Sequence, residues 1–306
     1  MIEVRDLRKE YGGFPAVEGS TFSVEAGEVF GIVGPNGAGK TTTLKMLAGL
    51  IEPTSGSVSV GGYDAGETEM RRTLGFLPEE SPLYEEMTAH SYLHFFADLY
   101  DVPEDVATRR IDETLSELDL EHRDRQLGDM SKGMKRKVAI ARSLINDPDV
   151  LIYDEPASGL DPLTTNYIIE FTSRLSEEGK TIVFSAHNLF HVESICDRVA
   201  IMNEGEIVAR GDLDELQAEH GETAYHVYTT VEVPDSVAKN GRYVRSVGSM
   251  AAVEQTREAA SAAGGRIVDI RTEQSSLEEV FLNVAEGGDG RSSRRQRTEP
   301  ETGPEA

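Results

Sequence analysis

A glycine-rich segment near residue 35 combines the residue types that bind phosphate. It fits the pattern G-x-x-x-x-G-K-[ST] at every fixed position, and its residues are Gly34, Pro35, Asn36, Gly37, Ala38, Gly39, Lys40, Thr41 and the adjoining Thr42. Glycines let backbone N–H groups curl around phosphate oxygens, and a following helix points its positive end at them. The lysine can reach the β- and γ-phosphates, and the threonine hydroxyl can contact Mg²⁺. A flexible glycine-rich turn is the alternative interpretation, and a strand before the segment with a helix after it would favour phosphate binding.

A pair of carboxylates ends an apolar segment later in the chain. Asp154 and Glu155 directly follow Val150–Tyr153. Asp154 is placed to hold Mg²⁺, directly or through water, and Glu155 to orient and deprotonate an attacking water as a general base. A solvated strand end gives the same pattern, so the pair gains its meaning from the glycine-rich segment in the same chain. Together the two features predict a P-loop NTPase that binds a nucleoside triphosphate with Mg²⁺.

The elements around these features alternate between strand and helix patterns. Val29–Val33 is a short apolar run ahead of the glycine-rich segment, and apolar residues recur at helical spacing from Leu44 to Ala48. Val150–Tyr153 and Thr181–Phe184 are apolar runs bounded by turn residues, which is typical of strands buried on both faces. The pattern predicts an α/β core with a mainly parallel sheet.

Flanking patterns extend this core to a predicted domain over residues 1–215. Alternating residues predict further strands and one hairpin, at Ile2–Arg5, Thr21–Val24, Ser57–Val60, Val199–Met202 and Glu206–Ala209. Between about residues 85 and 145, apolar residues at helical spacing predict a helical insertion, with one helix that begins near Ser131.

A second, smaller domain is predicted over residues 216–285. Strand patterns lie at Tyr225–Val233 and Ile267–Arg271, and a helical pattern lies at Glu254–Ala263. From residue 286 to residue 306 the chain has almost no apolar content, which predicts a disordered tail.

Composition narrows the possible partners. Thirty basic and 55 acidic residues among 306 give a net charge of −25, which disfavours nucleic acid and anionic lipid as partners. The charge suggests a protein adapted to a high-salt interior, although an acidic protein of no special habitat has the same composition. No apolar stretch is long enough to span a bilayer and no secretory signal opens the chain, so we expect no direct membrane insertion. Cys196, the single cysteine, excludes an intramolecular disulfide and is expected to be buried.

Four further features show a resemblance to a known family. Met130-Ser131-Lys132-Gly133-Met134 resembles the Leu-Ser-Gly-Gly-Gln signature of ABC ATPases, and Ser158-Gly159-Leu160-Asp161 resembles their D-loop. His187 matches the switch histidine, and Tyr11 lies where the family places an aromatic ring that stacks on adenine. These features follow family order over residues 1 to about 215, so the chain resembles the ATP-binding subunit of an ABC transporter.

The resemblance implies a fold and a mechanism. The fold is a P-loop NTPase core with an antiparallel β subdomain, a helical subdomain and a small α+β C-terminal extension. Two such domains pair head to tail, as a homodimer or with a second ATPase subunit, so that Ser131 and Gly133 contact the γ-phosphate held by the partner. Lys40, Glu155 and His187 carry the chemistry, with His187 sensing the γ-phosphate, and Asp161 couples the two sites. A separate integral-membrane permease places the subunit on the cytoplasmic face of the membrane.

Departures from the family pattern suggest a branch. The position of the family's Q-loop glutamine is Glu79, which could still reach Mg²⁺, and Lys132 and Met134 replace a glycine and a glutamine of the signature. The run from residue 77 to residue 88, together with Ser131–Lys135, resembles ABC-2 type exporters, which include drug- and sodium-extrusion systems, and Ser276–Phe281 is similar to the end of those subunits.

Several alternatives stay open at this stage. Ser131 could only cap its helix, Asp161 could only form a turn before Pro162, His187 could be structural and Tyr11 could only pack. The basic cluster Lys132, Lys135, Arg136 and Lys137 could be a solvated helix face or could attract nucleotide. A soluble ABC ATPase acting on ribosomes or other complexes is a second functional class, and an importer subunit is a third. One P-loop, no heptad run and the acidic charge disfavour the second class.

Overall fold

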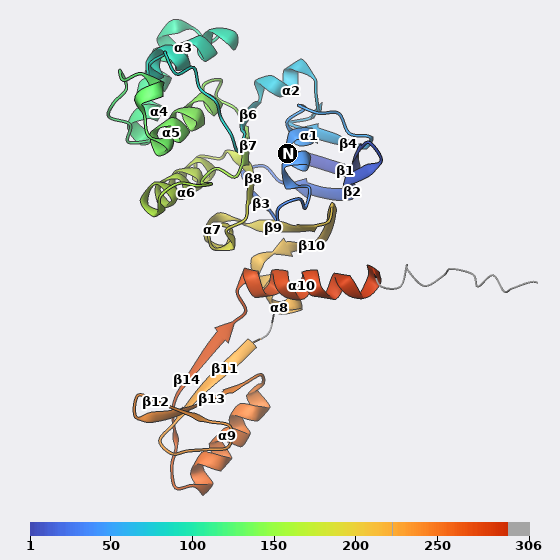
Figure 1. Ribbon diagram of the computed structural model, residues 1–306, viewed down its shortest axis with the longest axis vertical. Helices are drawn as coiled ribbons and strands as arrows, with labels where there is room; N and C mark the ends of the chain where they lie inside the picture. The colour runs from blue at the N-terminus through green and yellow to red at the C-terminus, as the bar shows by residue number, and fades with distance from the viewer. Residues whose placement is uncertain (222, 293–306) are drawn as a thin grey trace, which may run out of the picture. The chain divides into compact units, whose positions relative to one another are not determined.

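The computed structural model describes residues 1–221 and 223–292, and the chain divides into two compact units between Gly211 and Asp212. The first unit is built on a six-stranded sheet with the order β10-β9-β3-β8-β7-β6 (Figure 1). Its strands are β3 Val29–Val33, β6 Leu74–Leu77, β7 Val150–Asp154, β8 Thr181–Ala186, β9 Arg198–Asn203 and β10 Glu206–Asp212. Strand β3 runs parallel to β8 and β9, and β7 runs parallel to β6 and β8. Every residue of β3, β7 and β8 is buried, which confirms the parallel core expected from apolar runs.

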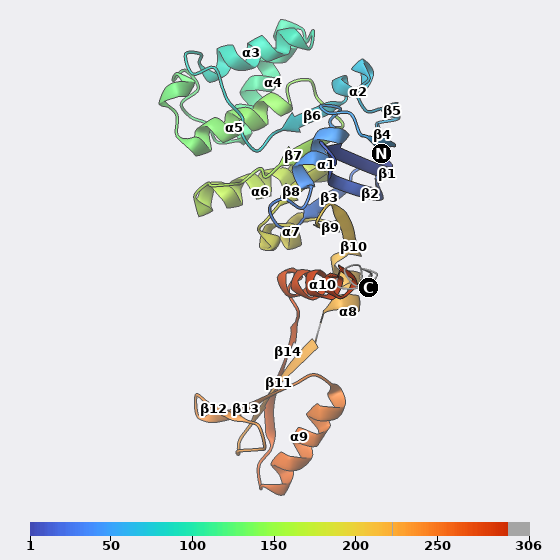
Figure 2. The same cartoon turned by 45° about the vertical axis from the view of Figure 1, so that its right-hand side comes forward.

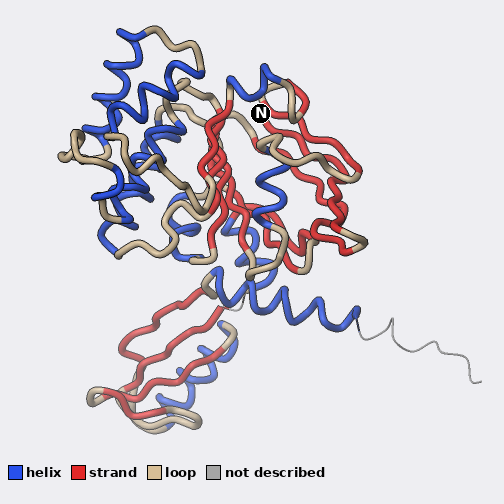
Figure 3. Tube along the Cα trace, turned by 45° about the horizontal axis from the view of Figure 1, so that its top comes forward, coloured by secondary structure: helices blue, strands red, loops and turns tan. Residues whose placement is uncertain are grey.

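A second, antiparallel sheet has the order β2-β1-β4-β5. Its strands are β1 Ile2–Tyr11, β2 Phe14–Val24, β4 Ser55–Val60 and β5 Tyr63–Asp64. Helix α1, Lys40–Leu47, lies between the two sheets and packs on strands of both (Figure 3). The rings of Phe22 and Phe30 stack across the same core with centroids 5.2 Å apart, so one apolar cluster holds both sheets and the second half of α1.

The expected helical insertion packs beside the parallel sheet. Its helices are α3 Ala89–Leu99, α4 Glu104–Glu117 and α5 Lys132–Ser143, with a 3₁₀ turn at Leu127–Asp129, and they lie on the far side of the parallel strands from the antiparallel sheet (Figure 1). Thr88 and Ser131 cap α3 and α5 by accepting backbone N–H groups of the first turn. The caps explain where these helices begin, and the start of α5 agrees with the prediction.

Three more helices complete the first unit. They are α2 Thr68–Arg72, α6 Pro162–Glu177 and α7 Leu189–Ile195. Helices α6 and α7 follow the carboxyl ends of β7 and β8 and pack on each other (Figure 2). They therefore border the edge of the sheet where the predicted chemistry lies.

The second unit is a four-stranded antiparallel sheet with the order β12-β13-β11-β14 and helix α9 packed on β11 and β13 (Figure 2). Its elements are α8 Leu213–His220, β11 Thr223–Thr229, β12 Val237–Lys239, β13 Arg242–Val247, α9 Met250–Ala262, β14 Ile267–Gln274 and α10 Leu277–Ser292. Strands β11 and β14 and helix α9 were expected. Strands β12 and β13 and helix α8 were not. Strand β12 is exposed and β13 is only partly buried, and neither strand has a clear apolar alternation.

The sequence predicted a tail from residue 286 onward, most of which the structure does not describe. Helix α10 continues to Ser292, past the boundary at residue 286, and residues 293–306 lie outside the described residues. Within the described part of the chain, the helices are too short or too polar to cross a bilayer.

Candidate functional site

The glycine-rich loop connects the end of β3 with the start of α1. Gly39 has a φ of 100°, and a Cβ there would lie 2.5 Å from the Ala16 carbonyl oxygen. A Cβ at Gly34 would lie 2.2 Å from the carbonyl oxygen of Met202. Neighbouring backbone therefore lies against the loop at Gly34 and at Gly39, and neither position has room for a side chain. The buried Lys40 ammonium donates to the carbonyl oxygens of Gly34 at 2.7 Å and Pro35 at 3.3 Å, so the loop curls around it.

A cavity of about 600 Å³ opens above this loop. Residues Pro35 to Thr42 form its floor, and the other lining residues are Phe14, Ala16, Glu79, Glu155, Ser158 and His187. The structure thus brings the predicted loop, Glu79, Glu155 and His187 to one place from separate elements. The carboxyl ends of parallel strands share one edge of a sheet, which is why residues after β3, β7 and β8 meet here.

Ser185 fixes the two carboxylate residues after β7. Its hydroxyl donates to Asp154 Oδ1 at 2.6 Å and accepts the N–H of Glu155 at 3.0 Å. Ser185 and Asp154 are buried, at 0% and 1% exposure, so these bonds are shielded from water. We did not predict Ser185 from the sequence. The available signal was a hydroxyl near the carboxyl end of an otherwise apolar buried strand.

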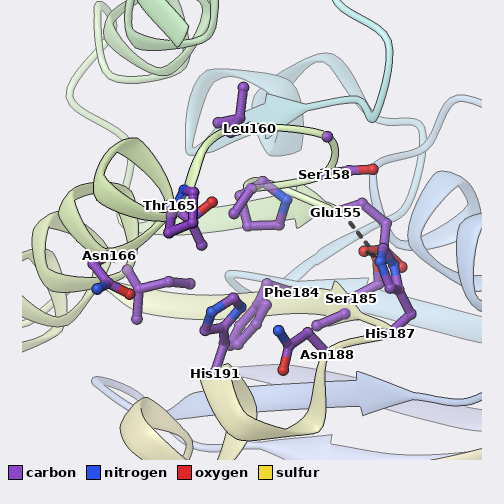
Figure 4. Close-up of a pocket in the computed structure, with 16 residues that line it drawn as sticks. Glu155, Ser158, Leu160, Thr165, Asn166, Phe184, Ser185, His187, Asn188 and His191 are labelled. Atoms are coloured by element: carbon purple, nitrogen blue, oxygen red, sulfur yellow. Dashed lines mark hydrogen bonds and ion pairs between the residues drawn. The ribbon is translucent and has the colours of Figure 1, made fainter.

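Glu155 lies between two nitrogen groups. Its Oε2 is 2.7 Å from His187 Nδ1 (Figure 4), and its Oε1 is 3.8 Å from Lys40 Nζ. A second cavity of about 270 Å³ is lined by Glu155, His187 and His191. Burial and, to a smaller extent, the nearby His187 lower the pKa of the His191 imidazole. The Glu155 side chain is nearly buried but borders both cavities, so its carboxylate can accept a proton from a water molecule there.

Ser131, Gly133 and Asp161 lie outside the cavity above the loop. The Ser131 hydroxyl caps α5, and a Cβ at Gly133 would lie 3.0 Å from the Thr164 methyl group. Asp161 caps α6 and accepts the Thr164 hydroxyl at 2.7 Å, and the hydrogen bonds from Thr164 lower its pKa. Both capping roles hold, as the alternative interpretations expected. Within one chain these residues do not reach the phosphate loop.

Comparison with known proteins decides the family. Residues 17–158 match the family model described as "ABC transporter". An ABC transporter ATP-binding protein of Nostoc sp. is 37% identical over 92% of this chain and 89% of its own length. This chain belongs to the ATP-binding proteins of ABC transporters. It is therefore an ATP-binding and ATP-hydrolysing ABC subunit.

Other relatives and solved structures agree with this family. The linearmycin resistance ATP-binding protein LnrL of Bacillus subtilis is 38% identical over 71% of this chain and 70% of its own length. The Nod factor export ATP-binding protein I of Burkholderia orbicola is 38% identical over 69% and 70%. A solved ATP-binding subunit of an ABC transporter has a TM-score of 0.66 at 36% identity, covering 72% of this chain and 92% of that one. A dimeric ATP-binding cassette in a post-hydrolysis state with ADP and Pi has a TM-score of 0.64 at 26% identity, covering 70% and 99%.

The aromatic residues of this ABC subunit differ in their relation to the cavity. Phe14 lines it, whereas Tyr11, the residue predicted to stack on adenine, is not among the lining residues. The two residues pair across the hairpin between β1 and β2, and both rings are well exposed, at 50% for Tyr11 and 71% for Phe14. Phe14 is thus a candidate base-contacting residue that we missed from the sequence, where an aromatic residue after Gly12-Gly13 was the only signal.

The oxygen groups of the ABC site suit Mg²⁺. The Thr41 hydroxyl and the Glu79 carboxylate line the cavity, and Asp154 lies buried beside Glu155. Among the described residues, no group of three His, Cys, Asp or Glu could hold a metal by itself. Mg²⁺ usually binds through one or two carboxylates together with phosphate oxygens and water. The residues present therefore fit an ion that arrives with the nucleotide.

The buried position of Arg136 contradicts the interpretation of the basic cluster at residues 132–137 as a solvated helix face. It is only 8% exposed, and its guanidinium turns inward from α5 toward the ends of β6 and β7. Helical periodicity explains the difference, because Arg136 lies on the face of α5 that carries the buried Ala139 and Ile140.

Proposed function

We propose that this ABC ATPase drives an exporter through a separate integral-membrane permease. The observation that supports its catalytic part best is the Glu155 carboxylate, placed between Lys40 and His187 above the phosphate loop. The export direction rests on relatives whose names refer to drug resistance and Nod factor export. The permease would hold the subunit at the cytoplasmic face of the membrane.

The phosphate loop and the oxygen-bearing residues near it have proposed roles in hydrolysis. Lys40 and the loop N–H groups of residue 34 and residues 36–42 would bind the β- and γ-phosphates, and Thr41, Asp154 and Glu79 would provide oxygen ligands for Mg²⁺. Bound Mg²⁺ would neutralise charge on the phosphate oxygens. Glu155 takes a proton from the attacking water. At the same time the water oxygen forms a bond to the γ-phosphorus, and the bond between that phosphorus and the leaving ADP oxygen breaks.

His187 serves this step in two ways. Its Nδ1 holds one Glu155 oxygen at 2.7 Å, which leaves the other oxygen to face the water. When both of its ring nitrogens carry a proton, a histidine at the cavity wall can also donate to a γ-phosphate oxygen from the second nitrogen. The nucleotide base would lie against the aromatic residues Tyr11 and Phe14.

The residues outside the cavity require a second chain. Ser131 and Gly133 would contact the γ-phosphate in a partner, and Asp161 would couple the two sites. A dimeric post-hydrolysis cassette with this fold supports the pairing. We expect a homodimer, because one chain carries every site element, while pairing with a second ATPase subunit is the alternative.

The variant Glu155→Gln tests the catalytic assignment. It should bind ATP with unchanged affinity, lose at least about 10²-fold in turnover, and form a dimer only with ATP, because the amide cannot accept the water proton. Turnover is measured by phosphate release, affinity by equilibrium binding, and dimerisation by light scattering. Glu170→Gln, an exposed change on α6, is the matched control and should behave like wild type. Wild-type turnover in Glu155→Gln would show that the base lies elsewhere.

A second experiment tests transport. The protein is affinity-purified from gently solubilised native membranes, and the chains that co-purify in equal amount are identified by mass spectrometry. A multi-span membrane protein is expected, and inside-out vesicles that contain the pair should then take up substrate with ATP. Purely soluble partners such as ribosomal proteins would leave the ATPase assignment intact and overturn the transport assignment.

A further inference from the structure

We propose that Arg136 is a positioning residue that holds Glu155 in its working geometry and ties it to the loop that carries Glu79. The proposal rests on the proposed role of Glu155 as the base. Arg136 belongs to α5, the helix capped by Ser131, and lies 19 residues before Glu155 in the chain. Neither the cavity nor the nucleotide chemistry described above uses it.

The guanidinium binds three consecutive backbone carbonyls at the end of β7. Nη2 donates to the oxygens of Asp154 at 3.1 Å and Glu155 at 2.8 Å, and Nε donates to the oxygen of Pro156 at 2.7 Å. A planar fork of fixed N–H directions suits this arrangement, whereas a single ammonium could not reach all three. The peptide that carries the base is thereby fixed on both sides of its Cα.

The same side chain reaches a second loop. Nη1 donates to the carbonyl oxygens of Pro78 at 2.7 Å and Glu79 at 3.0 Å, with the Ser81 hydroxyl oxygen at 3.4 Å. These residues lie 55 to 58 positions away in the sequence. One guanidinium therefore holds the Glu79 loop and the Glu155 peptide in fixed register, and joins both to α5.

The backbone of Glu155 requires such support. Its φ is 48°, a left-handed conformation that a residue with a side chain adopts only when its surroundings impose it. Ser185 holds the N–H of this residue, and its carbonyl oxygen is held by Arg136 at 2.8 Å and by the N–H of Ser158 at 3.1 Å. Loss of the Arg136 bonds would let the peptide relax and turn the carboxylate away from His187.

Burial makes Arg136 an unfavourable choice for packing alone. Burial lowers its pKa to about 10, so the side chain is still charged near neutral pH. Its hydrogen bonds go to carbonyl groups and a hydroxyl, and within the described residues no carboxylate forms a salt bridge with it. An apolar side chain would fill the same space without the desolvation of a charge. The feature that only arginine supplies is the fork that joins two loops.

The test uses Arg136→Lys, which keeps the charge but loses the fork, with Arg136→Gln as a second variant. Turnover of the full chain should fall about 10²-fold, the scale for a small misplacement of a catalytic group, while ATP affinity stays within about twofold. Lys137→Gln, the adjacent partly exposed cation, should change neither value. Loss of turnover and ATP affinity in parallel would indicate general damage and overturn the proposal.

A double-mutant cycle separates positioning from a merely structural role. In single-turnover assays, adding Arg136→Lys to Glu155→Gln should lower the residual rate by less than about twofold, because a residue that acts through Glu155 has nothing left to position. A further loss of about 10²-fold in that background would overturn the proposal, as would wild-type turnover in Arg136→Lys alone. Glu155→Gln by itself tests the base assignment, so failure of that assignment is recognised independently.

Discussion

Replacing Ser185 with alanine removes the hydroxyl that organises both carboxylate residues. Ser185 Oγ donates to Asp154 at 2.6 Å and accepts from the Glu155 N–H at 3.0 Å, and the residue has no exposed surface. A hydrogen bond to a charged group contributes about 1.5–3 kcal/mol, and an orphaned buried N–H costs about 1–3 kcal/mol. Allowing for local relaxation, Ser185→Ala should lower the free energy of unfolding by about 2–4 kcal/mol.

The same change should also slow ATP hydrolysis. The left-handed Glu155 residue then loses the hydrogen bond that anchors its N–H, and we expect turnover to fall about 10- to 100-fold, as for small misplacements of catalytic groups. Unfolding is followed by denaturant titration, with the slope checked for constancy so that a shifted midpoint reports stability. Turnover is measured at a temperature where the variant is fully folded. Ser185→Thr, which keeps the hydroxyl, should recover most of the rate.

Ser20 provides the matched control. Its hydroxyl is buried, at 2% exposure, and forms no hydrogen bond with the rest of the described chain. Ser20→Ala is the same chemical change at a site where no bond is lost, so it should be neutral or slightly stabilising. If Ser185→Ala and Ser20→Ala both stay within about 0.5 kcal/mol of wild type, with normal turnover, the proposed role of the Ser185 hydrogen bonds is wrong.

Three further predictions follow from other parts of the molecule. The chain has no tryptophan, so Phe14→Trp creates a single reporter whose fluorescence ATP should quench by stacking; a smaller change in Phe14→Trp than in Tyr11→Trp would argue against Phe14 as the base-contacting residue. The hydrogen bond from Lys180 lowers the pKa of the Asp147 carboxyl from its ordinary value of 3.8. The ionised Asp147 therefore stabilises the folded protein fully above about pH 4, and this stabilisation is lost as the pH falls through the lowered pKa of the folded state. Asp147→Asn, tolerated at a φ of 53°, should therefore destabilise by under about 1 kcal/mol at pH 7, and the difference should close on acidification below about pH 4, as urea titrations at several pH values would reveal. Finally, we propose from the net charge of −25 that the protein is adapted to high salt; its melting temperature should rise from low to multimolar KCl, and equal stability would count against this.

Local patterns predicted the core of the fold because burial on both faces leaves a direct record in the sequence. The apolar runs at Val29–Val33 and Thr181–Phe184 became β3 and β8, and the glycine-rich loop follows β3 as expected. Parallel strands meet at one edge, so the predicted closeness of Lys40, Glu155 and His187 needed no knowledge of side-chain contacts.

Contacts between residues far apart in the chain could not be predicted from the sequence. Arg136 resembled its exposed neighbours in composition, and only the fold shows that its fork meets loops 18 to 58 residues away. Ser185 could not be separated from an ordinary strand hydroxyl, and Phe14 could not be separated from an aromatic residue of the core. Strands β12 and β13 were missed because strands that are exposed or only partly buried do not need a regular alternation of apolar residues.

The single cysteine gives the protein a built-in measure of local opening. Cys196 follows α7, and its sulfur lies only 2.8 Å from where a Cβ of Gly31 would stand, wedged between that helix and β3. Burial raises the pKa of the thiol, so a thiol reagent reacts only after the segment lifts away. Because α7 begins two residues after His187, the labelling rate of the unmodified protein reports how firmly the histidine side of the site is held. A slower rate with ATP would show that nucleotide tightens this segment, without any engineered probe.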